Sequence, residues 1–287
     1  MRYFLEVSYK GTNYSGFQSQ KNANTIQAEI ENALTILFRI PATPLKGVTE
    51  VYDLPGQPAS TSSGGDNPLQ NGDGIRLIGS SRTDAGVHAV QNFFHFDTSL
   101  PLHSWRGIEG EARLLYKINS ILPPDIVVQK FMPVRIDAHC RFDAINREYK
   151  YFIYGHKDPF LSDRAFYFPY KIDLGLMQKA AGIIKECNDF TSFSKRKTQV
   201  KTFNSIINQS EWMRESKCLV YHVKANRFLR GMVRALTATM LQIGGKLSLD
   251  DFRKIIAARD CTLASFAVPA HGLFLISVEF PDNYFNQ

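Results

Sequence analysis

Strand-like and helix-like patterns follow one another in a mixed order along the first half of this 287-residue sequence. Residues 2–9 alternate apolar and polar side chains with the two-residue period of a half-buried strand. Apolar residues then recur at helical spacing over residues 26–37, and Thr25 is a good N-cap for this helix. Such an order favours a mixed α+β fold. The remaining elements predicted for this half are strands at 75–79, 91–97 and 126–131 and a helix at 104–121.

The second half of the chain contains a similar mixture of patterns. Both halves therefore favour split βαβ units, whose sheets are expected to join side by side in an α+β fold. We expect residues 1–137 to form an N-terminal domain and residues 138–287 a C-terminal domain, with a ligand in the groove between them. The elements predicted for the second half are strands at 147–154, 204–212, 218–224 and 273–279 and helices at 174–184, 228–244 and 249–258.

One segment of the first half has the composition of an insertion. Five Gly, three Pro and three Ser occur among the twenty residues 55–74, and only Ala59 and Leu69 are clearly apolar. So few apolar groups cannot offset the entropy that ordering this segment would cost. We therefore expect a flexible excursion from the N-terminal domain.

Charge and cysteine content narrow the classes of function. The chain has 34 Lys and Arg against 27 Asp and Glu, and the net charge of +7 favours a polyanionic partner without establishing one. The four cysteines lie far apart, without a CxxC pair or a Cys/His cluster, so we expect a reduced, cytoplasmic protein without zinc. No run of about 18 apolar residues occurs and a strand pattern begins at Arg2, so neither a membrane helix nor a signal peptide is expected.

A short loop between two predicted strands is the strongest candidate for a catalytic segment. It has the sequence R-T-D-A-G-V-H-A over residues 82–89. On pattern alone it is a tight turn, in which Asp84 is an Asx-turn residue whose side chain accepts a local hydrogen bond and Gly86 adopts a positive φ. His88 is interpreted as a hydrogen-bonding loop residue and not as a catalytic group.

The same loop resembles the signature of the TruA family of tRNA pseudouridine synthases, and further strings match that family in the right order. Together these strings extend the resemblance over essentially the whole chain apart from the insertion. They are Y-K-G-T-N-Y-S-G-F-Q at 9–18, R-E-Y-K-Y at 147–151, N-D-F-T-S-F at 188–193, N-R-F-L-R-G-M-V-R at 226–234 and A-H-G-L-F-L at 270–275.

The resemblance implies the pseudouridine synthase fold, with two ferredoxin-like halves around a central basic cleft. It also implies a homodimer that converts uridine to pseudouridine at positions 38, 39 and 40 of the tRNA anticodon arm, without a metal or an organic cofactor. Asp84 matches the nucleophile, Tyr149 the tyrosine that stacks on the target base, and Arg234 the basic partner of the aspartate. The expected substrate-binding residues are Arg82, Tyr149, Arg230, Leu273, Lys195 and Arg196.

These residue types suit the implied chemistry. An ionised carboxylate can form a transient bond without a cofactor, and a nearby guanidinium offsets the cost of shielding its charge from water. A uridine that leaves its stack loses a few kcal/mol, and an aromatic ring recovers about 1 to 3 kcal/mol per stacked base. Whether Asp84 attacks the sugar or the base stays open at this point.

Each assignment has a simpler alternative. Tyr149 also fits an ordinary strand aromatic, Arg234 a solvated helix residue, and the charged run 195–197 a solvated loop. For the whole chain, the alternative is a non-catalytic RNA-binding or RNA-chaperone protein on the same scaffold. A carboxylate where an anion must bind gives such a protein no advantage, so the presence of Asp84 favours the enzyme.

Overall fold

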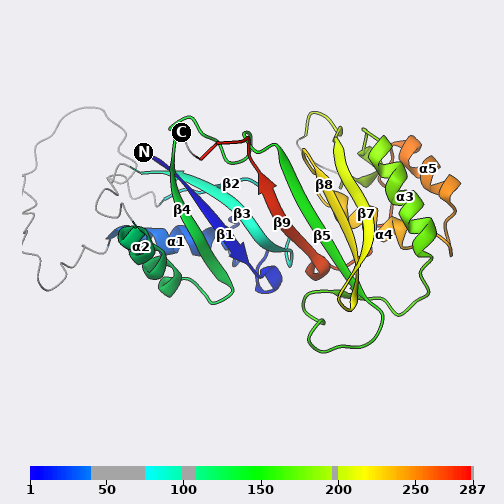
Figure 1. The fold of residues 1–287 in the computed structure, drawn as a ribbon, viewed down its shortest axis with the longest axis horizontal. Coiled ribbons are helices and arrows are strands. Elements are labelled where there is room, and N and C mark those ends of the chain that lie inside the picture. Colours follow the sequence, from blue (N-terminus) through cyan, green and yellow to red (C-terminus); the bar gives the residue numbers. More distant parts are fainter. Residues whose placement is uncertain (40–74, 99–107, 196–199, 286–287) are drawn as a thin grey trace, which may run out of the picture.

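One mixed sheet runs along the long axis of the molecule (Figure 1). The computed structural model describes residues 1–39, 75–98, 108–195 and 200–285. Within these residues the sheet has nine strands in the order β4-β1-β3-β9-β5-β8-β7, with β2 paired to β3 and β6 to β5. The strands are β1 (Arg2–Tyr9), β2 (Ile78–Gly79), β3 (His88–Asp97), β4 (Ile126–Val134), β5 (Asn146–Tyr154), β6 (Phe166–Tyr167), β7 (Ile207–Glu215), β8 (Cys218–Ala225) and β9 (Leu273–Glu279).

The last strand of the chain lies in the middle of this sheet. On one side β9 pairs in parallel with β3, where His88 is opposite Phe274 and Ala89 is opposite Leu275. On its other side β9 pairs in an antiparallel manner with β5. Strands from the two halves of the sequence are therefore joined through β9. The prediction of a mixed α+β fold is confirmed.

Helices pack near both ends of the sheet (Figure 1). α2 contacts β4 and α1, whereas α3 contacts β7 and α5, and α4 contacts β5. Asp173 caps α3 and Ser248 caps α5 through side-chain hydrogen bonds. None of the described helices has the length and apolar character of a membrane span. The helices are α1 (Ile26–Arg39), α2 (Ile108–Ile121), α3 (Leu174–Glu186), α4 (Met232–Met240) and α5 (Leu249–Ala258), with short 3₁₀ helices η1 (Gly11–Asn13), η3 (Thr191–Phe193) and η4 (Ala270–Gly272).

Strand β5 buries alternate side chains, as its two-residue pattern predicts. The side chains at positions 147, 149, 151 and 153 are buried, and those at 146, 148, 150 and 152 are partly exposed. The buried set includes one charged residue, Arg147, together with Tyr149. The centre of the sheet therefore brings an arginine into the core beside a candidate active-site tyrosine.

Some element boundaries differ from the sequence prediction. The helix predicted at 228–244 extends only from Met232 to Met240. It begins late because Gly231 has a φ of +75° and precedes it in a left-handed conformation, and it ends at the C-cap Leu241, before the glycines predicted to end it. Arg230 therefore lies before the helix that carries Arg234. The strand predicted at 204–212 begins at Ile207, since Asn204 forms a bridge with Asp189 instead.

The remaining points concern one short strand that was not predicted and two predicted segments that the structure does not describe in full. Strand β6 (Phe166–Tyr167) was not predicted, because two residues are too few to produce a periodic pattern. The predicted insertion at 55–74 and the first four residues of the helix predicted at 104–121 lie outside the described residues.

Candidate active site

The loop that carries Asp84 connects β2 to β3 and is held by the first strand and the segment that follows it. The Val87 N–H donates to the Asp84 carbonyl oxygen at 3.2 Å, and Gly86 has a φ of +78°. The tight turn and the positive φ of Gly86 are thus confirmed, but the hydrogen bond is accepted by the main chain of Asp84 and not by its side chain, as an Asx turn would require. The hydroxyls of Tyr9 and Thr83 lie 2.8 Å apart, and the Phe17 N–H donates to the Thr83 carbonyl oxygen at 3.1 Å. These bonds fix the backbone on the N-terminal side of Asp84.

Two arginines flank the Asp84 carboxylate. Oδ1 of Asp84 lies 4.0 Å from Nε of Arg230, and Oδ2 lies 3.9 Å from Nη1 of Arg234. Arg234 is held in place, because its Nε and Nη2 both donate to the Val268 carbonyl oxygen, at 3.1 and 2.7 Å. The side chain of Arg230 is 61% exposed, that of Arg234 19% and that of Asp84 25%. The carboxylate is therefore accessible to a substrate and lies between two positively charged side chains.

The candidate tyrosine lies on β5 in the buried register. The Tyr149 ring meets the Phe228 ring edge to face, with 5.0 Å between the centroids and 82° between the planes. Burial raises the pKa of the Tyr149 hydroxyl well above its usual value, and the nearby Asp84 charge raises it further. Tyr149 therefore remains protonated at neutral pH and can donate a hydrogen bond.

The other residues predicted to bind substrate differ in their exposure and in their contacts. Arg82 is exposed, and its Nη1 donates to Oε1 of Gln18 at 3.4 Å. The Lys195 N–H donates to the Arg230 carbonyl oxygen at 3.0 Å, so Lys195 lies beside the arginine that flanks Asp84. Leu273 is buried as the first residue of β9. Arg196 lies outside the described residues.

Arg147 is a residue of this region to which the sequence analysis assigned no role. It is buried, and its guanidinium donates four hydrogen bonds to backbone carbonyl oxygens. Burial lowers its pKa, and it forms no ion pair with a carboxylate in the part of the chain that the structure describes. Its position in the buried register of β5 was the signal that could have identified it. The acceptors are the carbonyl oxygens of Ala144 (2.8 Å), Asn226 (3.0 Å), Ser80 (3.4 Å) and Arg141 (2.6 Å).

Through these four bonds Arg147 ties together the segments that surround Asp84. Ser80 begins the loop that carries Asp84, and Asn226 begins the loop that carries Arg230. Arg141 and Ala144 belong to the connection between β4 and β5. Arg147 therefore joins the start of the Asp84 loop to the start of the loop that carries Arg230.

His88 is buried at the start of β3 and forms two hydrogen bonds. Its Nδ1 accepts from the Gly11 N–H at 3.2 Å, and its Nε2 lies 3.1 Å from the His271 carbonyl oxygen, to which only a protonated Nε2 can donate. Burial lowers the pKa of His88 to about 4, so the ring is neutral at physiological pH. Its observed role is that of a hydrogen-bonding residue, which agrees with the sequence interpretation.

A pH dependence of stability follows from His88. Because its folded pKa of about 4 lies below the unfolded value of about 6.5, the unfolded chain binds more protons between these limits. Its contribution is complete above pH 6.5 and is lost as the pH falls towards 4. We expect His88→Gln to reduce the slope of unfolding free energy against pH by about 1.4 kcal/mol per pH unit in this window.

Urea unfolding at a series of pH values measures this slope. The exposed His156 provides the control, since replacing it by Gln should leave the slope as in the unmodified protein. An unchanged slope in His88→Gln would show that the imidazole also binds a proton in the folded state.

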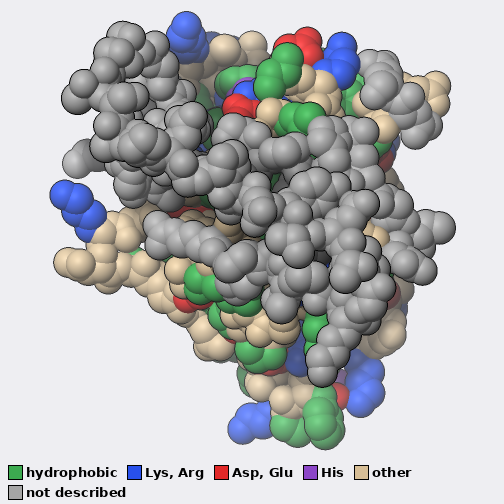
Figure 2. Space-filling view, turned by 90° about the vertical axis from the view of Figure 1, so that its left-hand side faces the viewer, with side chains coloured by type: hydrophobic (Ala, Val, Ile, Leu, Met, Phe, Trp, Pro, Cys, Tyr) green, Lys and Arg blue, Asp and Glu red, His purple; other side chains and the backbone are tan. Residues whose placement is uncertain are grey.

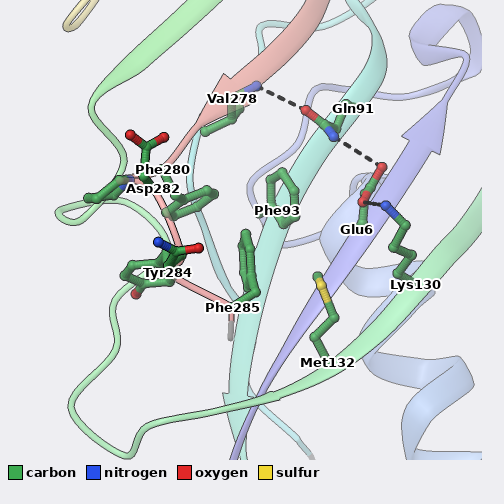
Figure 3. Close-up of a pocket in the computed structure, with 12 residues that line it drawn as sticks. Glu6, Gln91, Phe93, Lys130, Met132, Val278, Phe280, Asp282, Tyr284 and Phe285 are labelled. Atoms are coloured by element: carbon green, nitrogen blue, oxygen red, sulfur yellow. Dashed lines mark hydrogen bonds and ion pairs between the residues drawn. The ribbon is translucent and has the colours of Figure 1, made fainter. Parts of the chain in front are cut away.

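A separate pocket of about 380 Å³ lies where the C-terminal segment 280–285 packs against β1, β3 and β4 (Figure 3). A row of polar contacts runs along it: Gln91 accepts from the Val278 N–H and donates to Glu6, which pairs with Lys130. The polar groups in this row already satisfy one another. None of the residues predicted for catalysis or substrate binding lines this pocket.

The site around Asp84 has the components of nucleophilic catalysis on a polyanionic substrate. It combines an accessible carboxylate, two arginines close to it and a protonated tyrosine on β5, which is separated from β3 by β9. An arrangement of this kind can carry out nucleophilic chemistry next to a phosphate-rich substrate.

Comparison with known proteins identifies the family. A family model described as tRNA pseudouridine synthase matches residues 187–281. A tRNA pseudouridine synthase A from Parabacteroides distasonis is 38% identical over 285 residues, which cover 99% of this chain and 98% of that protein. Proteins of the same name from Porphyromonas gingivalis and Staphylococcus aureus are 37% and 32% identical, over 99% of this chain and 99% and 92% of their own lengths. The chain belongs to the tRNA pseudouridine synthase family, which confirms the resemblance found in the sequence.

Proposed function

We propose that this enzyme converts uridine to pseudouridine at positions 38, 39 and 40 of the tRNA anticodon arm, with Asp84 as the nucleophile. Membership of the tRNA pseudouridine synthase family supports the activity and the tRNA substrate. The match of residues 82–89 to the family signature supports the assignment of Asp84. The single observation that carries the proposal is the placement of the Asp84 carboxylate between Arg230 and Arg234.

The proposed reaction is an isomerisation that needs no oxidant or reductant. The C1′–N1 bond of uridine breaks and a C1′–C5 bond forms, while C5 loses a proton and N1 gains one. Asp84 forms a transient bond during this exchange and is released at the end, with attack on the sugar or on the base both compatible with the site. Arg234, held by Val268, keeps a positive charge beside the carboxylate throughout.

The remaining assignments extend the same proposal. Tyr149 supports the flipped base, and its protonated hydroxyl can donate a hydrogen bond to that base. Arg82, Arg230 and Lys195 bind the phosphates around the target nucleotide, and exposure of Arg82 and Arg230 supports this. Leu273 borders the uridine site, and Arg196 adds to the charge beside Lys195.

The proposal also includes the organisation of the protein. Residues 1–137 and 138–287 form two ferredoxin-like domains around a basic cleft, and the protein acts as a cytoplasmic homodimer without metal or organic cofactor. The boundary at 138 falls between β4 and β5, which supports this division. The family model at 187–281 lies entirely within the second of these domains.

Chemical mapping of pseudouridine in an unmodified tRNA transcript tests the function. We expect the wild-type protein to modify uridines at positions 38 to 40, and not to modify a control transcript with cytidines at these positions. Tight tRNA binding without any modification would favour the non-catalytic RNA-binding protein. Modification only outside the anticodon arm would contradict the proposed positions.

A further inference from the structure

Phe142 presents an aromatic ring to solvent in the connection between β4 and β5. The residue is 75% exposed. Its ring lies on the ring of His139, with 4.2 Å between the centroids, and the Arg141 guanidinium carbon lies 5.9 Å from the Phe142 centroid. Most of the Phe142 surface is nevertheless free to contact another molecule.

Local hydrogen bonds hold this ring in position. The backbone N–H groups of Arg141 and Phe142 both donate to Nδ1 of His139, at 3.2 and 3.3 Å. The Asp143 carboxylate accepts from the His139 N–H at 2.8 Å and from the Tyr284 hydroxyl. The turn is thus formed before any ligand binds, which lowers the entropy cost of binding.

The turn lies against the loop that carries Asp84. Nη2 of Arg147 donates to both the Arg141 carbonyl oxygen (2.6 Å) and the Ser80 carbonyl oxygen (3.4 Å). One guanidinium nitrogen therefore connects the segment of Phe142 to the start of the Asp84 loop. The ring of Phe142 contacts His139 and Arg141, whereas the Asp84 carboxylate pairs with Arg230 and Arg234.

Arg147 connects the segments that carry three arginines, Arg82, Arg141 and Arg227, because it donates to the carbonyl oxygens of Ser80, Arg141 and Asn226. Burial lowers the pKa of Arg141, and the positive charges of Arg82 and Arg227 lower it further. None of these three arginines forms an ion pair with a carboxylate among the described residues, and Arg82 donates only to the Gln18 amide oxygen. Figure 2 shows the end of the molecule near α2, on which most of the visible Lys and Arg side chains lie towards the edge of the face.

We propose that Phe142 is a stacking platform for an RNA base outside the uridine site, and that Arg82, Arg141 and Arg227 bind the phosphates on either side of that base. This inference rests on the proposed function and names a second contact of the same RNA. Arginines that repel one another fit a polyanion, and an exposed ring among them fits an unpaired base of that polyanion. An acidic peptide could pair with the arginines, but its carboxylates would not stack on the exposed Phe142 ring as a base does.

The first test measures binding of the tRNA anticodon arm by the full-length protein. We expect Phe142→Ala to raise Kd by about five- to a hundredfold, because one stacked base is lost. KM should rise more than kcat falls, and Phe142→Tyr should restore both binding and KM. Phe160→Ala is the matched control, since Phe160 is 81% exposed but its neighbour Arg164 is paired with Asp163. Equal Kd values for Phe142→Ala and the wild type would overturn the proposal.

The second test identifies the base that stacks. Single abasic nucleotides are placed in turn along the anticodon arm, and Kd is measured for the wild type and for Phe142→Ala. At one position we expect the loss of the base to weaken binding to the wild type but not to the variant. Equal penalties in the two proteins at every position would exclude stacking on Phe142. Because binding is measured without turnover, failure of the platform and failure of the isomerase activity are distinguishable.

Discussion

The Asp84→Asn variant is expected to bind tRNA and to form pseudouridine at least about a thousandfold more slowly than the wild-type protein. Asparagine has nearly the shape of aspartate, so the loop between β2 and β3 should keep its conformation. Its amide oxygen, however, is a poor nucleophile and carries no charge. The two arginines at 3.9 and 4.0 Å would then have no carboxylate to stabilise.

The affinity of Asp84→Asn for tRNA should not fall together with the rate. The Asp84 carboxylate repels a polyanion, so its removal should leave the affinity for tRNA unchanged or slightly higher. A variant that is inactive yet binds well would separate catalysis from binding. It would also separate the enzyme from the RNA-binding alternative, because a binding protein gains nothing from the carboxylate.

Single-turnover rates with saturating enzyme give the measurement, and Asp163→Asn is the matched control. Asp163 also lies between two cations, Lys10 and Arg164, but has no contact with Arg230 or Arg234. We expect this control to retain the wild-type rate within about a factor of two, as is usual for surface substitutions. Activity of Asp84→Asn within tenfold of the wild type would rule out Asp84 as the nucleophile.

The second large effect is expected at Arg147. Replacing Arg147 by Met keeps a long side chain in the core but leaves four backbone carbonyl oxygens without their donor. Buried acceptors that lose their partners cost about 1 to 3 kcal/mol each when water cannot replace the donor. Since some of these groups can relax towards solvent, we expect the unfolding free energy to fall by about 3 kcal/mol.

Catalysis should suffer as well in the folded Arg147→Met protein. The loops that begin at Ser80 and Asn226 would no longer share a donor, so the distance between Asp84 and Arg230 would vary. Urea unfolding gives the stability, and rates measured well below the unfolding transition give the activity of folded protein. Arg147→Lys should recover part of both, because an ammonium group can donate to only some of the four acceptors.

Arg214 on β7 serves as the control for this experiment. It is an exposed strand arginine, and Arg214→Met should change the unfolding free energy by less than about 0.5 kcal/mol. If Arg147→Met also lowered the unfolding free energy by less than about 0.5 kcal/mol, the four hydrogen bonds would not be what holds the loops together.

Much of the local structure could be predicted because it depends on near neighbours. The bounds of β1, α5 and β9 were predicted to the residue from their periodicity. The turn at Gly86 followed from the preference of glycine for positive φ. The helix predicted from residue 228 was wrong at its start, because the left-handed conformation of Gly231 is set by contacts and not by its own helix pattern.

The candidate site was predictable as a set of residues but not as an arrangement. Asp84 and Arg234 could be singled out through the family motifs, yet their separation of 3.9 Å depends on the Val268 carbonyl oxygen that holds the arginine. Arg147 occupies the buried phase of its strand, which indicates burial but does not identify its acceptors. Phe142 was not singled out, because exposure is a property of the folded surface.

The sequence by itself determined the mixed α+β character, most strands and helices, the Asp84 turn and the family. Periodicity and turn chemistry act between residues a few positions apart, so the chain carries this information locally. Only the tertiary structure decided that β9 lies between β3 and β5, that Arg147 joins the loops around Asp84, and that Phe142 lies among three unpaired arginines. Those features arise from packing between segments distant in the sequence, which no local pattern specifies.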